Sequence, residues 1–349
     1  MKVKGLKHQI QILDCTLRDG GLGLEDAYKN KLSDISFQKD DVNRIADHLN
    51  RSGIDIIELG SIEISYDDKT RFAIYQDICN VSKKIPADRH KEQMYVGLFR
   101  GPDTPVEDIP EHNAQLVDGL RVIIRYSELE KSLWFCRELS KKGYKVFVQP
   151  MLTMRYTEDE IDLMIRECNK MSAYALYFVD SYGYMQPEDI SYFVRKYDEG
   201  LNKDIRIGFH AHNNINLAFS NAKHFLRSKT EHGLICDSCV TGMGQGAGNL
   251  QTELIVPYMN DCFQSDYRFD DILQICELIE PYSTDSLWGY SVTRLLPALH
   301  KTAYKYAVAL RKHYGLSYVE INRLLSRMPE DIRHRYTPEN TQRLLAFLK

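Results

Sequence analysis

The sequence has no concentrated block of positive charge and no long apolar run. Its 45 Lys and Arg residues are outnumbered by 49 Asp and Glu residues, and the net charge is -4, so nothing favours nucleic-acid binding. No stretch approaches the ~20 apolar residues that a membrane span requires. The first eight residues lack the apolar core of a signal peptide. These absences predict a cytoplasmic protein that binds neither nucleic acid nor membrane.

The cysteine pattern of a disulfide-rich protein is also lacking. The eight cysteines are scattered along the chain, without the dense spacing of a disulfide framework. One pair, Cys236-Asp-Ser-Cys239, has C-x-x-C spacing, but the chain offers no second pair to complete a zinc site. We therefore interpret these cysteines as packed thiols in a reducing compartment.

The chain does contain a regular alternation of short apolar runs and longer segments of helical period. These runs are rich in β-branched residues, as strands are. The predicted strands are 11–14, 54–59, 94–98, 119–124, 145–150, 175–179, 206–209 and 234–238. Amphipathic helices are predicted between them at 40–52, 128–142, 157–171, 186–196 and 215–227.

Eight strand–helix units predict an α/β fold of the closed (β/α)8 class, the TIM barrel. A doubly wound sheet is the alternative, but it normally uses fewer strands. From about residue 267 the strand signal ends, and helices are predicted at 270–280, 292–312, 317–327 and 338–348. We therefore expect a barrel over residues 1–262 and an all-helical C-terminal region over residues 263–349.

Polar residues follow several of the predicted strands. His210 and His212 close the seventh strand, and side chains two residues apart in a strand point to the same side. Two such histidines can bind one divalent ion, although a pair held by backbone groups is the plain alternative. Asp19 follows the first strand. Because barrel closure brings the ends of the first, seventh and eighth strands together, we expect these three groups to meet.

Three motifs in this order resemble the metal-dependent carbon–carbon lyases of the DRE-TIM metallolyase superfamily. They are Thr-Leu-Arg-Asp-Gly at 16–20, His-Ala-His-Asn at 210–213, and the glycine-rich loop 242–249. The glycine-rich loop and the pair Asp180-Ser181 look most like 4-hydroxy-2-oxovalerate aldolases. The resemblance covers roughly the first 260 residues.

The resemblance implies a role for each matching residue. Asp19, His210 and His212 would be metal ligands, and Asn249 would be a further ligand or lie beside one. Arg18 would face the carbonyl oxygen of the substrate. One carboxylate and two imidazoles suit Mn²⁺ or Mg²⁺, with Zn²⁺ as the alternative, and they leave positions open for substrate and water.

We therefore expect an aldolase that cleaves a 4-hydroxy-2-oxo acid to pyruvate and an aldehyde. The pyruvate enolate formed on cleavage needs fixed positive charge, which Arg18 and the ion would supply. Ser181 and Arg125 are candidate substrate-binding residues at strand ends. Tyr290 resembles the barrel-mouth tyrosine region of the aldolases and could donate a proton, although a tyrosine on an amphipathic helix is commonly packed.

The chain departs from these families at one position. The aldolases have a histidine, the proposed base, three residues after the metal-binding aspartate, and the acyl-CoA lyases and synthases usually have glutamine there. This chain has Leu22. Two alternatives therefore stay open: a Claisen-type synthase or acyl-CoA lyase using the same metal site, and a barrel that has lost catalysis and acts as an interaction module.

The C-terminal helices allow two interpretations. They could cap the barrel, or they could form an interface for self-association. The resemblance adds an aldehyde dehydrogenase as a candidate partner, because the aldolases place a helical C-terminal region beside one.

Overall fold

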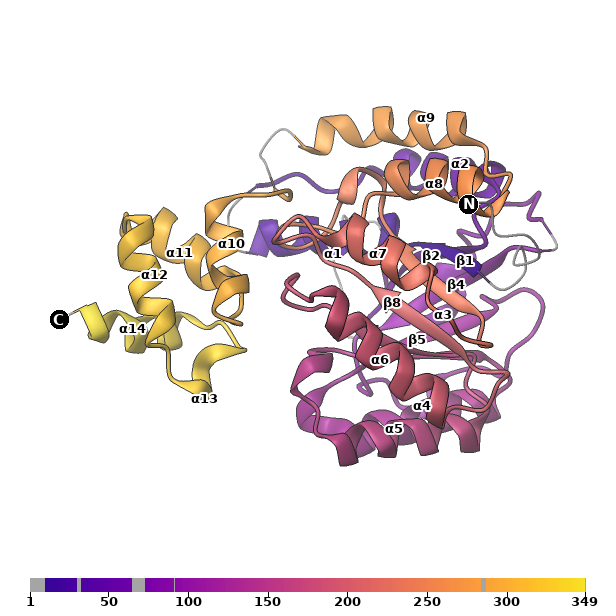
Figure 1. Ribbon diagram of the computed structural model, residues 1–349. Helices are drawn as coiled ribbons and strands as arrows, with labels where there is room; N and C mark the ends of the chain where they lie inside the picture. The colour runs from indigo at the N-terminus through magenta and orange to yellow at the C-terminus, as the bar shows by residue number, and fades with distance from the viewer. Residues whose placement is uncertain (1–9, 30–32, 65–72, 91, 284–286, 349) are drawn as a thin grey trace.

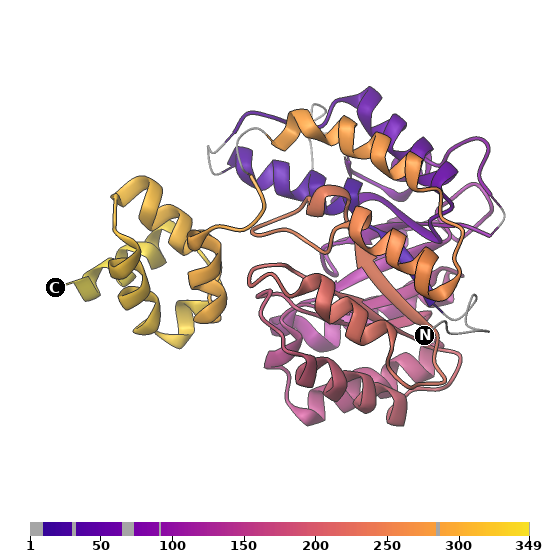
Figure 2. The same cartoon turned by 45° about the horizontal axis from the view of Figure 1, so that its top comes forward.

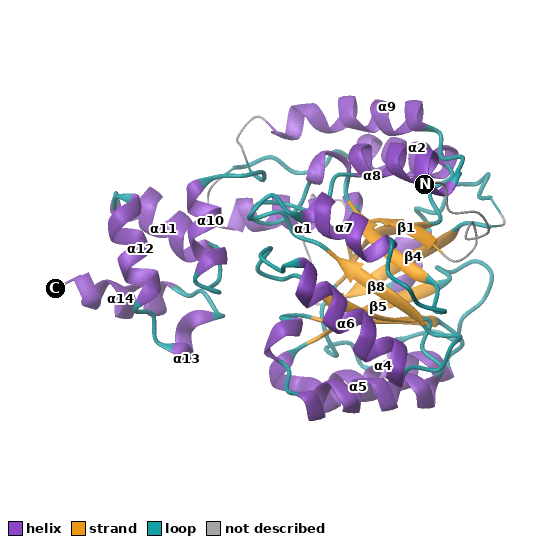
Figure 3. Ribbon diagram, in the orientation of Figure 1, coloured by secondary structure: helices purple, strands orange, loops and turns teal. Residues whose placement is uncertain are grey.

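The computed structural model describes residues 10–29, 33–64, 73–90, 92–283 and 287–348. Eight parallel strands close into a barrel. Figure 3 shows the helices around the strands. The strands are β1 Ile10–Asp14, β2 Ile56–Ile62, β4 Met94–Phe99, β5 Gly119–Ile124, β6 Lys145–Pro150, β7 Ala175–Val179, β8 Arg206–His210 and β9 Leu234–Ser238. All eight overlap the predicted strands.

The barrel closes because β1 pairs with β9 on one side and with β2 on the other. Ile10 to Asp14 lie in register with Leu234 to Ser238, and Leu13 lies opposite Ile56. A short extra strand, β3 (Ile74–Tyr75), adds to the end of β2 and was not predicted. The predicted TIM barrel is confirmed.

Helices cover the outside of the barrel. Those on the barrel are α2 Lys39–Ser52, α3 Ile78–Ser82, α4 Leu129–Lys141, α5 Glu158–Met171, α6 Pro187–Gly200, α7 Ala218–Leu226, α8 Thr252–Phe263 and α9 Phe269–Ile279. Their apolar faces and the outer faces of the strands form the main hydrophobic core. A smaller core inside the barrel includes Leu13, Phe147 and Tyr177.

Helix α1, Thr16–Lys29, was not predicted, because its first two turns contain three glycines, which disfavour a helix. The structure gives a reason for two of them. A Cβ on Gly20 would lie 2.5 Å from the Met243 sulfur, and a Cβ on Gly23 would lie 2.9 Å from the backbone of Gly244. The helix therefore lies directly against the glycine-rich loop after β9, and this contact places Asp19 in its first turn.

The last five helices form a separate unit, which we call the C-terminal unit. They are α10 Val292–Leu299, α11 Lys305–Tyr314, α12 Tyr318–Ser326, α13 Glu330–Arg333 and α14 Pro338–Leu345. Their buried side chains form a hydrophobic cluster of their own. Figures 1 and 2 show the unit beside the barrel, and α1 lies on the side of the barrel that faces this unit.

The prediction of one continuous helix over 292–312 is wrong. It breaks between α10 and α11, where Pro297 lies inside the last turn of α10 and Lys301 has a φ of 53°. Helix α9 begins after the predicted boundary at residue 263, but its buried residues belong to the barrel core. The suggested partner role of the C-terminal helices stays a prediction.

We expect the C-terminal unit to unfold independently of the barrel. Leu324 is 1% exposed and belongs to the separate cluster, so Leu324→Ala should lower the stability of this unit by about 2–5 kcal/mol. Hydrogen exchange measured by mass spectrometry should then accelerate over residues 292–345 and not in the barrel strands. Leu299→Ala, at a leucine that is 56% exposed, is the matched control. Equal acceleration in the barrel would contradict two separate cores.

Candidate active site

A cavity of about 970 Å³ opens at the carboxyl-terminal ends of the barrel strands. Its lining includes the ends of β2, β4, β5, β6, β7 and β8 and the first turns of α1. The opposite wall comes from the C-terminal unit, through residues 297–298, 302–305 and 334–336. The site therefore lies between the barrel and the helical unit.

The structure brings together the three predicted metal ligands. One ligand atom each from Asp19, His210 and His212 lie within 4.8 Å of one another. The Asp19 Oδ2 atom is 3.6 Å from His210 Nε2. The two imidazole rings are 4.9 Å apart and almost perpendicular, at 82°, so their edges can face one point.

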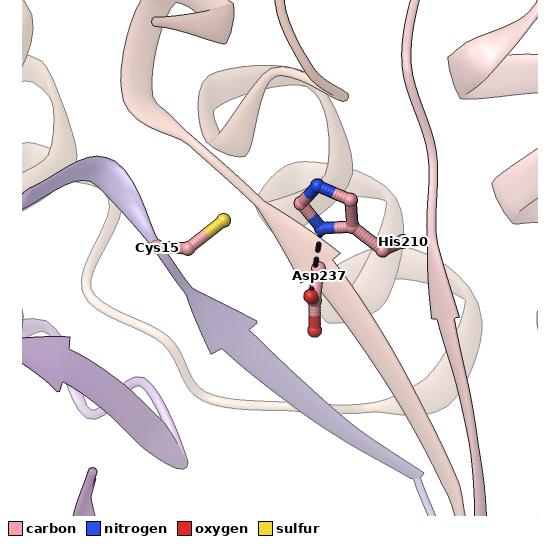
Figure 4. A group of neighbouring side chains, drawn as sticks. All are labelled: Cys15, His210 and Asp237. Carbon is pink, nitrogen blue, oxygen red and sulfur yellow. Dashed lines mark hydrogen bonds and ion pairs between the residues drawn. The ribbon is translucent and has the colours of Figure 1, made fainter. Parts of the chain in front are cut away.

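A carboxylate at the bottom of the site orients His210. His210 Nδ1 donates a hydrogen bond to Asp237 Oδ2 at 2.8 Å, drawn as the dashed line in Figure 4. The Nε2 atom is therefore left to face Asp19. A carboxylate on the far nitrogen of a metal-binding histidine fixes the tautomer and makes the ring a better ligand.

The backbone orients His212 in the same way. His212 Nδ1 donates to the carbonyl oxygen of Asp180 at 2.9 Å, so Nε2 is again the free nitrogen. The Asp180 carboxylate does not face the site: it accepts the backbone N–H groups of Tyr184 and Met185 and shapes the turn that presents its carbonyl. Burial, reinforced by the nearby His210, lowers the pKa of His212 to about 4. His212 is therefore neutral at pH 7, as a ligand must be.

Asn249, at the end of the glycine-rich loop, holds Asp19. Its Nδ2 donates to Asp19 Oδ2 at 2.7 Å and to the Met243 carbonyl at 3.0 Å. Its Oδ1 atom is buried and has no hydrogen-bond partner among the described residues. Because buried polar atoms are nearly always paired, this oxygen is available to a bound cation.

Beneath these ligands, charged side chains fill the barrel interior. Arg121 is fully buried and donates to Glu58 at 2.8 Å and to Asp237. Glu58 also accepts Arg18 Nε at 2.8 Å. Arg18 in turn lies 2.8 Å from Asp19. With the contacts of His210 to Asp19 and Asp237, these residues form a closed ring of alternating charge.

The ring sets the charge states of the site. Burial alone would raise the pKa of Asp19, but Arg18 and the two histidines outweigh it and hold the pKa well below its ordinary value. Burial alone would lower the pKa of His210, but Asp19 and Asp237 outweigh it and raise the pKa well above its ordinary value. Without a metal ion, His210 is therefore a cation whose Nε2 proton faces Asp19, and a divalent ion would replace that proton.

These observations fit a divalent metal ion. The donor set is one carboxylate and two imidazoles with oriented Nε2 atoms, and the Asn249 oxygen is a fourth donor without a partner. The thiols of Cys15 and Cys239 lie beside the same residues, 3.1 Å apart. Figure 4 shows the Cys15 thiol near His210, with no bond drawn between them. Both Cys236 and Cys239 are buried.

The other predicted site residues have different surroundings. Ser181 lines the cavity and accepts the Leu152 N–H at 2.8 Å, which leaves its hydroxyl proton to donate. Arg125 also lines the cavity, but its guanidinium is already paired with Asp103 and Glu128. Tyr290 does not line the cavity and is 55% exposed. The roles predicted for these three residues stay predictions.

Sequence reasoning missed Arg121, Asp237 and Tyr304. A signal existed for the first two, because each is a single charged residue inside an apolar strand, where charge is costly unless it is paired. Tyr304 lines the cavity and donates to Asp26, one turn of α1 after Leu22. No local pattern could have placed Tyr304 there, because it reaches the barrel from the C-terminal unit.

Comparison with known proteins supports the resemblance to metal-dependent carbon–carbon lyases. Residues 126–279 match the HMGL-like family model. The chain is 28% identical over 259 residues to a 4-hydroxy-2-oxovalerate aldolase of Burkholderia pseudomallei, covering 72% of this chain and 68% of the relative. It is 26% identical over 250 residues to an oxaloacetate decarboxylase of Mycobacterium tuberculosis, covering 70% and 68%.

A solved structure has the same fold. The N-terminal domain of a protein from Bacteroides vulgatus superposes with a TM-score of 0.76 and 22% identity, covering 90% of this chain and 99% of that one. The resemblance to the DRE-TIM superfamily is thus confirmed by the HMGL-like match and the aldolase relatives. Among the described residues, no helix combines the length and apolar character needed to cross a bilayer.

The charge ring predicts a large effect of one buried substitution. Arg121→Met removes the cation between Glu58 and Asp237 and leaves both carboxylates undercompensated inside the barrel. We expect the free energy of unfolding to fall by about 3–5 kcal/mol, measured by urea denaturation. Arg166→Met, at an exposed arginine on α5, should change it by no more than about 0.5 kcal/mol. A loss below about 1 kcal/mol for Arg121→Met would show that the ring is not a stabilising unit.

Proposed function

We propose that the chain, which is similar to enzymes of the HMGL-like family, is a divalent-metal-dependent aldolase that cleaves a 4-hydroxy-2-oxo acid to pyruvate and an aldehyde. One observation carries the proposal. The oriented Nε2 atoms of His210 and His212, the Asp19 carboxylate and the Arg18 guanidinium all line one cavity. That set of groups suits a 2-oxo acid and the enolate derived from it.

Each residue of the set has a distinct role in the proposal. Asp19, His210 and His212 would hold the ion, with Asn249 as the further ligand through Oδ1. The bound ion would polarise the carbonyl oxygen at C2 of the substrate. Arg18 Nη2 is buried and has no partner among the described residues, so it can donate to the same oxygen.

Arg18 matters most where negative charge develops. Cleavage breaks the C3–C4 bond, and its electron pair becomes the enolate, with charge on the C2 oxygen. Glu58 and Asp19 already hold the Arg18 guanidinium in place, so it need not reorganise during the reaction. Preorganised charge of this kind contributes several kcal/mol to a reaction barrier.

The proton of the substrate's 4-hydroxyl group needs an acceptor, and Leu22 cannot be one. We assign this role to Tyr304 and Asp26 instead of Tyr290. Tyr304 donates its hydroxyl proton to the Asp26 carboxylate, and Lys305 pairs with the same carboxylate. The substrate hydroxyl can pass its proton to the Tyr304 oxygen while the Tyr304 proton moves to Asp26. Return of one proton along the same path to C3 of the enolate gives pyruvate, so charge and protons balance.

A second candidate reaction follows from Leu22. Decarboxylation of a 2-oxo acid that carries a carboxylate on C3 also yields the pyruvate enolate, but it requires no base to remove a hydroxyl proton. An apolar side chain at position 22 favours such a reaction over aldol cleavage. The Mycobacterium tuberculosis relative is an oxaloacetate decarboxylase, so release of CO₂ from oxaloacetate is the assay that distinguishes the two.

Both reactions require enolate stabilisation, which pyruvate itself can report. The protein supplied with Mn²⁺ or Mg²⁺ should exchange the methyl protons of pyruvate in D₂O, followed by mass spectrometry, and chelation should stop the exchange. Arg18→Met should slow exchange by about 10²- to 10³-fold, whereas Arg166→Met should match the wild-type protein. Exchange that persists without any divalent ion would refute the proposal.

The proton relay is tested separately. Tyr304→Phe removes the hydroxyl between substrate and Asp26, so aldol cleavage of 4-hydroxy-2-oxovalerate should slow by about 10²- to 10⁴-fold. Tyr318→Phe, at a tyrosine on α12 that is 44% exposed, is the matched control. A rate within about twofold of the wild type in Tyr304→Phe would remove Tyr304 from the mechanism.

A further inference from the structure

The cavity is larger and more positive than a short 2-oxo acid requires. Its volume of about 970 Å³ lies at the upper end of the range for small-molecule sites, about 300–1,000 Å³. Seven Lys and Arg residues line it, against three Asp and Glu residues. The part beyond Arg18 and the histidines therefore has positive charge that the pyruvate half of a substrate does not use.

Several of these cations are already neutralised by partners. Arg100 pairs with Glu63, and Lys305 with Asp26. The remaining pairings at the outer part of the cavity are Lys29 with Glu25, and Arg125 with Asp103 and Glu128. Their charges are balanced within the protein and need no ligand.

Arg155 is different. It ends the short 3-10 turn Thr153–Arg155 that follows β6 and is only partly exposed. No carboxylate pairs with its side chain among the described residues, and its guanidinium carbon lies 4.5 Å above the centre of the Tyr126 ring. Stacking on an aromatic ring fixes the plane of a guanidinium and leaves its N–H edges free. Arg155 is thus an oriented cation without an ion-pair partner among the described residues.

The C-terminal unit supplies the facing wall. The Tyr182 hydroxyl, at the end of the barrel, contacts His334 Nδ1, so the two walls meet there. The charge of Arg155 acts on both Tyr182 and His334. Arg335, next along the chain, lines the same cavity and is exposed. Its side chain also has no carboxylate partner in the described part of the chain. Glu330, on the same wall, pairs with His334 and Arg333, and it interacts with Arg155 only from beyond ion-pair distance.

We propose that Arg155 and Arg335 form a subsite for a second anionic group, a carboxylate or a phosphate, at the aldehyde end of the substrate. The inference rests on the proposed function, since it identifies which half of the 2-oxo acid lies near the metal ligands. The substrate is then a dianion, and different parts of the protein bind its two ends. The barrel binds the 2-oxo acid, and the junction with the C-terminal unit binds the second anionic group.

Charge favours an anion over a neutral group here. A partly buried guanidinium without a counterion attracts carboxylate or phosphate strongly, because charge-assisted hydrogen bonds are about twice as strong as neutral ones, and the flat fork of arginine matches both anions. A neutral aldehyde would leave the partly buried Arg155 guanidinium without an ion-pair partner among the described residues. Selection against neutral substrates follows from the same contacts.

Binding to the Mn²⁺-loaded full-length protein tests the subsite. Isothermal titration calorimetry should compare 2-oxoglutarate and 2-oxoadipate with 2-oxohexanoate, which has no second charge, and 2-oxo-4-phosphonobutanoate should separate phosphate from carboxylate selection. We expect at least one dianion to bind about tenfold or more tightly than 2-oxohexanoate. Equal affinities, or no binding by any dianion, would overturn the inference.

Variants assign the preference to the named residues. Arg155→Leu should bring the ratio of the dianion and monoanion dissociation constants close to one, and Arg155→Lys, which keeps the charge without the fork, should retain part of it. Arg335→Leu should lower the ratio as well, and Arg166→Leu is the matched control. A full preference in Arg155→Leu would overturn the assignment. Oxalate, which reaches only the metal ligands, reports whether each variant retains a folded metal site.

The two proposals can fail separately. Pyruvate exchange without any dianion preference would remove the subsite and leave the reaction standing. A dianion preference that depends on Arg155, in a protein that does not exchange pyruvate protons, would keep the subsite and refute the aldolase chemistry.

Discussion

Three carboxylates, two guanidinium groups and one imidazole alternate in sign around a closed ring inside the barrel, and the candidate site depends on this ring. Arg121 links Glu58 to Asp237, and Arg18 links Glu58 to Asp19. His210 closes the ring between Asp19 and Asp237. Removing charges from water is costly unless each is paired and hydrogen-bonded. Every charge in the ring has two oppositely charged neighbours, and the ring aims Asp19 and His210 at one point. Single buried atoms of four members have no hydrogen-bond partner among the described residues: Arg18 Nη2, Glu58 Oε1, Arg121 Nε and Asp237 Oδ1.

The ring also explains why the site needs barrel closure. Its members come from α1, β2, β5, β8 and β9, and none of these elements alone presents more than two of them. Only the pairing of β1 with both β2 and β9 brings them around one axis. The C-terminal unit then adds the outer wall of the cavity. Chemistry at the metal ligands and recognition at the far end are therefore assigned to separate parts of the fold.

Sequence predicted the parts of the structure that obey a local period. Apolar β-branched runs gave eight strands within a few residues of their ends, and the strand-end rule for barrels brought Asp19 to His210 and His212. Helix α1 was not predicted, because its glycines disfavour a helix and are needed for close contact with residues 243–244, which are far away in sequence. The roles of Arg121 and Asp237 were not predicted, because the strands that contain them were expected to be apolar throughout. Tyr304 and Arg155 depend on how two units meet, which no local pattern records.

The bond between Asn249 and Asp19 joins residues 230 positions apart. A ribosome adding roughly 5–20 residues per second takes about 10–50 s to make the intervening chain. Throughout that time the nascent polypeptide carries Asp19 without Asn249, and the ring stays open until residues 210 and 237 have been made. The strands emerging first must stay hydrated at their charged positions, so the interior can dry only near the end of translation.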